Sequence, residues 1–104
     1  FKAEIVDLIA PAIPENVTTA RTGASSIKVF WDQGEEADLA GYRVYRRLGN
    51  EDEPSMIGEV QIPYSIYEDT EAPDENMYVY YSVSSFDESD PPNESERSAE
   101  VEAE

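Results

Sequence analysis

Apolar and polar residues alternate with a period of two in several short stretches of the chain. The longest such run spans residues 79–86, in which Val79, Tyr81 and Val83 alternate with tyrosine and serine. A period of two places one apolar row on one face of an extended strand. Because this run is also the richest in β-forming residues, it predicts a central β-strand.

The same alternation predicts further strands elsewhere. They fall at residues 27–31, 42–47, 56–62, 64–67 and 99–103, with a lead-in strand or linker within residues 1–13. No stretch shows apolar spacing of three and four over about ten residues, so helix should be negligible. Short strands at intervals of about 8 to 12 residues predict an all-β, immunoglobulin-like antiparallel β-sandwich of about seven strands with Greek-key connections.

The phase of the alternation also predicts which side chains fill the core. On the inward phase lie Val17, Ile27, Val29, Trp31, Tyr42, Val44, Tyr67, Val79, Tyr81, Val83 and Val101. A slip of one residue would place Lys28, Arg43 and Ser82 inside instead, so the register is strongly specified. Trp31 as an exposed binding platform is the alternative, but its inward phase favours the core.

The chain of 104 residues is long enough for one domain with an unaided core. Pro11 and Pro14 interrupt regular strand pairing, so we expect a linker or lead-in segment at residues 1–12 and one folded domain at residues 13–104. No apolar run approaches the roughly 20 residues of a membrane-spanning helix, and the first residues lack the pattern of a signal peptide. Membrane insertion is therefore not expected.

Composition narrows the possible functions. The chain has 24 acidic and 7 basic residues, a net charge of -17, and neither histidine nor cysteine. These absences exclude Ser-His-Asp triads, redox Cys pairs and the usual zinc sites. The negative charge disfavours nucleic acid as a partner. Paired carboxylates of the glycosidase kind remain conceivable, but nothing in the sequence places two of them across a cleft. We therefore expect no enzyme and no cofactor.

Acidic clusters in the predicted loops are the candidates for metal binding. They lie at residues 35–38, 51–53, 68–75 and 87–90. Asp87, Asp90 and Asn93 could supply several of the six to eight oxygens that calcium prefers, but no EF-hand spacing is present. A solvated acidic loop is the expectation, with calcium as the alternative. Asp69, at a strand end, is predicted to accept backbone N–H groups in the following turn.

A stripe of arginine and tyrosine is the candidate ligand face. The outward phase sets Arg43, Tyr45 and Arg47 beside Tyr80 of the neighbouring predicted strand. Such a stripe could stack on a sugar or pair with an acidic partner. The alternative is cross-strand packing of arginine stems over tyrosine rings, with salt bridges to surface acids such as Glu59.

Several segments in order resemble a fibronectin type III domain of the bacterial and archaeal surface-protein type. The resemblance covers residues 11–103 and is carried by Pro14-Glu-Asn-Val17, Trp31, residues 38–46 (DLAGYRVYR), Tyr67-Glu-Asp69, residues 81–87 (YSVSSFD) and the segment from Asn93-Glu-Ser95 to Ser98. It implies a tryptophan in the core on the second strand and a third strand that contains Tyr42, Val44 and Tyr45.

The sequence departs from the family pattern at two positions. Where the family usually has its tyrosine-corner residue, this chain has Val79, so either Tyr78 serves from a shifted register or the corner is absent. Pro92 stands where a glycine commonly precedes the Asn-Glu-Ser segment, which changes the turn geometry of that loop.

The resemblance and the composition together predict a non-catalytic module. We expect a structural spacer or protein-interaction domain from a larger secreted or surface prokaryotic protein, monomeric in isolation and in contact with neighbouring domains of its own polypeptide. Its location would be extracellular or at the cell surface, with the periplasm as an alternative. The alternative function is a module that binds a polysaccharide or another protein through Arg43, Tyr45 and Tyr80.

Overall fold

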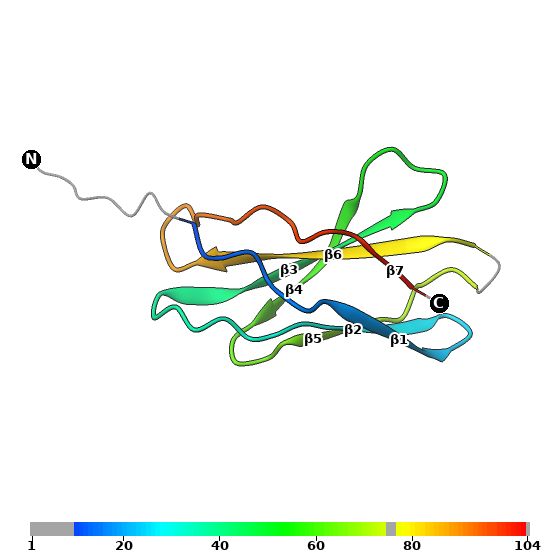
Figure 1. Cartoon of the computed structure of the whole chain (residues 1–104), viewed down its shortest axis with the longest axis horizontal. Helices are drawn as coiled ribbons and strands as arrows, with labels where there is room; N and C mark the ends of the chain where they lie inside the picture. The colour runs from blue at the N-terminus through cyan, green and yellow to red at the C-terminus, as the bar shows by residue number, and fades with distance from the viewer. Residues whose placement is uncertain (1–9, 75–76, 104) are drawn as a thin grey trace, which may run out of the picture.

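The computed structural model describes residues 10–74 and 77–103, and these form two antiparallel sheets packed face to face (Figure 1). The strands are β1 (Thr18–Gly23), β2 (Ser26–Phe30), β3 (Leu39–Leu48), β4 (Ser55–Gln61), β5 (Ile66–Asp69), β6 (Val79–Asp87) and β7 (Val101–Glu102). One sheet has the order β1-β2-β5 and the other β4-β3-β6-β7. The predicted all-β sandwich is thus confirmed, and the described residues contain no helix.

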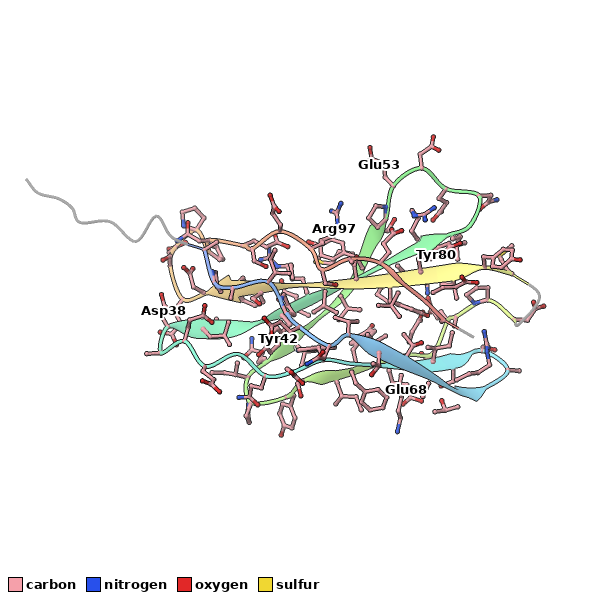
Figure 2. All side chains as sticks on the ribbon, viewed as in Figure 1. Asp38, Tyr42, Glu53, Glu68, Tyr80 and Arg97 are labelled. Atoms are coloured by element: carbon pink, nitrogen blue, oxygen red, sulfur yellow. The ribbon has the colours of Figure 1, made fainter. Side chains whose placement is uncertain are left out.

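The core lies between the inward rows of the two sheets. Val29 pairs with Tyr67 in one sheet and Val44 pairs with Val83 in the other. Trp31, directly after β2, is 4% exposed, and its ring meets that of Tyr42 at a centroid distance of 5.2 Å with the planes 63° apart. Figure 2 shows Tyr42 pointing into the space between the sheets.

The structure places most of the expected core residues in one buried cluster. Those buried are Ile27, Val29, Trp31, Tyr42, Val44, Val79, Tyr81 and Val83. Val17 and Tyr67 are only partly buried and pack against this cluster, and Val101 is likewise partly buried. Ser82 and Ser84 of β6 are also buried, although the alternation assigns them to the outward phase. The outer face of β6 is therefore covered rather than open.

The first strand differs from the prediction. It is β1 at Thr18–Gly23, and residues 10–13 form no strand. The alternation could not reveal β1, because this edge strand is mostly polar and most of its side chains are exposed. The part of the predicted lead-in at residues 1–9 lies outside the described residues.

Two other strands have shifted bounds. β5 begins at Ile66 rather than Tyr64, and β7 is only two residues long. Ahead of β7, serine side chains replace the backbone hydrogen bonds that a longer strand would make with β6, as described below.

Residues 11 and 12, at the end of the expected lead-in, contact the sandwich. Pro11 is buried, the Ala12 N–H donates to Glu36 Oε2 at 2.8 Å, and Ser85 Oγ donates to the Ala12 carbonyl at 2.9 Å. Over the described residues, no helix is long and apolar enough to cross a membrane.

Candidate functional site

The outer face of β3 and β6, on the four-stranded sheet, brings together the four residues of the predicted ligand face. Cross-strand pairing sets Tyr45 opposite Ser82 and Arg47 opposite Tyr80. The Arg47 guanidinium carbon lies 4.5 Å from the centroid of the Tyr80 ring. This is a cation–π distance, so the pair is held as the alternating phases of the two strands predict.

Glu94 is the hub of this face, and the sequence did not identify it. Its carboxylate accepts hydrogen bonds from Arg43 Nη1 at 2.8 Å, Tyr45 Oη at 2.5 Å and Ser84 Oγ at 2.5 Å. Arg43 also donates through Nε to Glu59 Oε2 at 3.0 Å. Small serines on β6 leave room for the carboxylate to lie over the sheet.

These contacts change the ionisation of the groups involved. Burial by itself would raise the pKa of Glu94, but the hydrogen bonds from Ser84, Tyr45 and Arg43 favour the charged form and lower the pKa overall. The pKa of the Tyr45 hydroxyl is raised, first by burial and then by its hydrogen bond to Glu94. Glu94 is therefore held as a carboxylate and Tyr45 as a neutral phenol.

Each arginine of the outer face is paired with an acid, stacked on an aromatic ring, or both. Arg47 makes a two-pronged salt bridge to Glu100, with both N–O distances 2.8 Å. Arg43 lies 4.7 Å from the Phe86 ring centroid. The Arg97 guanidinium carbon lies 5.3 Å from the centroid of the Tyr45 ring.

Glu94, Arg97 and Glu100 belong to one segment, residues 94–100, which we call the strap. The strap runs along the edge of β6 without forming a regular strand. Ser95 exchanges hydrogen bonds with Ser85, its N–H donating to the Ser85 carbonyl at 2.8 Å and its Oγ accepting from the Ser85 N–H at 3.0 Å. Ser98 does the same with Val83, at 2.9 and 3.0 Å.

The spacing of these serines is the sequence signal that was missed. Two serines three residues apart, Ser95 and Ser98, match alternate residues of β6 along its edge. Since the partners lie 10 to 15 positions away, the pairing needs the strand register to be known first.

A cavity of about 560 Å³ lies beside the outer face. Its lining consists of Tyr45, residues 94–98 and Glu100. Three of these residues are glutamates, so the cavity is strongly polar.

Asp69 is the centre of a second, buried cluster that joins the two sheets. It accepts the Glu71 N–H at 3.0 Å, which is the turn role predicted from the sequence. It also receives Arg46 Nη1 from β3 at 2.8 Å and the Tyr81 hydroxyl from β6 at 2.6 Å. Burial, followed by the hydrogen bond to Asp69, strongly raises the pKa of Tyr81.

The candidate calcium residues are only partly brought together. Asp87 is 1% exposed, and its carboxylate accepts the N–H groups of Ser89 at 3.1 Å and Asn93 at 2.8 Å and the Asn93 side-chain amide at 3.0 Å. Asp90 is exposed. Asp87 and Asn93 are thus used to shape the loop, and no cluster of three or more acidic side chains suited to a metal occurs within residues 10–74 and 77–103.

The two residues at the expected tyrosine corner differ in burial. Tyr78 is 66% exposed whereas Val79 is fully buried. The shifted-register alternative for Tyr78 is therefore wrong, because a corner tyrosine must be turned into the sandwich.

Comparison with solved structures identifies the fold. The FN1-FN3 domains of chicken CNTN1 superpose with a TM-score of 0.78 at 18% identity, over 89% of this chain and 32% of that one. A Fn3-like protein from Clostridium thermocellum gives 0.73 at 21%, over 92% and 94% of the two chains. The spore cortex lytic enzyme SleM of Clostridium perfringens gives 0.73 at 22%, over 93% and 29%.

This chain thus spans about a third of the chicken structure. No protein-family model matches the sequence, and a comparison with curated proteins finds no match. At these identities the likeness concerns the fold alone, and that fold is the fibronectin type III domain.

Proposed function

We propose that the chain is a non-catalytic module, a spacer or protein-interaction domain, of a larger secreted or surface prokaryotic protein. The observation that carries this proposal is that charged side chains that could act in catalysis or ligand binding instead form ion pairs and hydrogen bonds within the domain. Arg43, Arg46 and Arg47 each contact a carboxylate at 2.8 Å, and Asp69 and Asp87 are buried hydrogen-bond acceptors within the sandwich.

The nature of the similar structures supports the proposal. Both the chicken CNTN1 structure and the titin A168–A170 structure contain several domains, of which this chain matches about a third. The lytic enzyme SleM is longer as well, and this chain covers only 29% of it. A domain of this fold can therefore be part of a longer enzyme, and the fold by itself does not assign catalysis to it. We propose that this chain is a monomer that contacts neighbouring domains of its own polypeptide.

A domain exchange tests the spacer function. In the full-length protein, residues 13–104 are either deleted or replaced by an unrelated fibronectin type III domain such as the Clostridium thermocellum Fn3-like protein. A spacer supplies distance and stiffness, so the replacement should restore the activity of the whole protein and the deletion should not. Failure of the replacement, with both variants expressed and folded, would show that this chain contributes a specific surface.

The second candidate function is binding of a polysaccharide or a partner protein through the outer face. It is favoured by the polar cavity beside Tyr45 and by the stacked Arg47 and Tyr80. Titration with oligosaccharides while the Tyr45 and Tyr80 resonances are followed by NMR separates the candidates. Saturable shifts in both residues, reduced in Arg47→Gln, would support binding, whereas the spacer predicts none.

A further inference from the structure

Two tripeptides in the chain have the Asn-x-Ser/Thr pattern that accepts an N-linked glycan. They are Asn16-Val17-Thr18 and Asn93-Glu94-Ser95. The transfer enzyme must reach both the asparagine amide and the hydroxyl two residues later. The fold places these two tripeptides in opposite environments.

In the second tripeptide both groups are engaged in the structure. Asn93 is partly buried, and its Nδ2 donates to Asp87 Oδ2 at 3.0 Å and lies 3.4 Å from Ser89 Oγ. The Ser95 side chain is 8% exposed and its Oγ donates to the Glu96 carbonyl at 2.8 Å while accepting from Ser85. Access to Asn93 would require the loop and the strap to open together.

In the first tripeptide both side chains are exposed. Asn16 and Thr18 lie at the surface, where the chain enters β1. Among the described strands β1 lies at one end of its sheet and pairs with β2, and Thr18 is its first residue. Asn16 has a φ of 58°, in the left-handed region that asparagine tolerates, and it stands two residues before β1 begins.

We propose that Asn16 is an acceptor for an N-linked oligosaccharide and that Asn93 is not modified in the folded chain. The inference rests on the proposed secreted or surface location. In the transfer, Asn16 Nδ2 forms a bond to C1 of the first sugar of a polyprenyl-diphosphate-linked oligosaccharide. The bond between C1 and the diphosphate oxygen breaks, polyprenyl diphosphate leaves, and one amide proton passes to a base of the enzyme.

The local structure tolerates this product. Asn16 Nδ2 donates to Asp32 Oδ2 at 2.6 Å, and both residues are exposed. The amide carries two hydrogens, of which this bond uses one. After transfer one N–H remains on Nδ2, so the contact to Asp32 can persist and the entry into β1 need not change.

The test uses the purified, folded chain as acceptor in vitro. The enzyme is an oligosaccharyltransferase chosen because it modifies synthetic peptides of residues 12–21 and 89–98 alike, together with its lipid-linked donor. Peptide mass spectrometry should find at least about tenfold higher occupancy at Asn16 than at Asn93, because both asparagines donate to a carboxylate but exposing the second tripeptide also costs the hydrogen bonds of Ser95 Oγ with Ser85 and Glu96. Asn16→Gln and Thr18→Ala should abolish the major product, and Thr18→Ser should retain it.

Equal occupancy of the two sites, a preference for Asn93, or no modification at Asn16 would overturn the inference. Asn93→Gln is the matched control and should leave the product at Asn16 unchanged, with folding of each variant checked by its melting transition. Since the reaction does not depend on where the protein resides, its failure counts against the acceptor site alone. Failure of the domain exchange counts against the spacer function alone.

Discussion

Asp69 shows at the scale of one residue how a buried charge is tolerated in this sandwich. It is 4% exposed, yet its oxygens accept hydrogen bonds from Arg46, Tyr81 and the Glu71 N–H. A buried ion pair offsets its desolvation only when the remaining lone pairs are also satisfied. The cluster joins β5 of one sheet to β3 and β6 of the other, so it helps to fix how the two sheets pack face to face.

Asp69→Asn should destabilise the domain by about 3 kcal/mol, because it leaves the Arg46 guanidinium without its carboxylate in a largely buried place. Urea titration at neutral pH measures the loss. Glu68→Gln is the matched control on the same strand, since Glu68 is exposed and its carboxylate accepts a hydrogen bond from Ser26 Oγ at 2.7 Å. Equal losses of unfolding free energy for the two variants would show that the Asp69 cluster adds no more stability than an exposed glutamate on the same strand.

Trp31 gives a second prediction at this scale. Trp31→Ala should cost about 3 to 5 kcal/mol from lost burial and the cavity left behind. Its indole N–H is buried with no hydrogen-bond partner in the described part of the chain. Trp31→Phe removes that N–H and keeps an aromatic ring against Tyr42, so it should cost clearly less than Trp31→Ala. Chemical denaturation of both variants checks the order, and a loss under about 1 kcal/mol for alanine would contradict a core role.

At the scale of elements, the strap takes the place of a long final strand. Ser95 and Ser98 supply the hydrogen bonds along the edge of β6, and Glu94 holds the strap over the outer face. Charged and irregular edges also discourage pairing with a second chain. The strap thus covers Ser84 and closes this side of the sandwich.

Glu94→Gln should destabilise the domain by about 1 to 2 kcal/mol at pH 7, because three donors lose a charged acceptor. The pKa of Glu94 is lowered by folding, so its contribution is present above the unfolded value of about 4.3 and is lost as the pH falls through the lower folded value. The difference between wild type and variant should therefore shrink at acid pH. Thermal melts at several pH values measure it.

Glu96→Gln is the control for this series, because Glu96 lies on the same strap with an exposed side chain. It should change stability by less than about 0.5 kcal/mol at any of these pH values. A wild-type advantage over Glu94→Gln that stays constant down to strongly acid pH would contradict the role given to the carboxylate.

What the sequence could predict depends on how local the signal is. Apolar alternation was sufficient to predict strands β2, β3 and β6. The phases of β3 and β6 also predicted that Arg47 and Tyr80 are neighbours on the outer face. β1 has no such pattern because it is a polar edge strand. The turn role of Asp69 is local and was predictable, whereas its partner Arg46, 23 residues away on the other sheet, was not. Glu94 and Glu100 were missed for the same reason.

At the scale of the whole molecule, charge dominates the surface. With 24 acidic and 7 basic residues, one-to-one pairing would leave 17 acids without a basic partner. Figure 2 shows Asp38, Glu53 and Glu68 projecting from different parts of the sandwich. Repulsion among such charges opposes the compact state and is weakened by salt.

The melting temperature should therefore rise with salt. Between about 0.01 and 0.3 M NaCl the Debye length falls from about 30 Å to below 10 Å, so most of the repulsion should be screened by the upper limit. Asp52 and Glu53, both exposed in the loop between β3 and β4, test whether charge repulsion causes this rise, and Figure 2 shows Glu53 projecting from the sandwich. The double variant Asp52→Asn and Glu53→Gln should melt higher than wild type at low salt and gain less from added NaCl. A flat melting temperature for wild type over this range would mean that the acids are spaced too widely for their repulsion to matter.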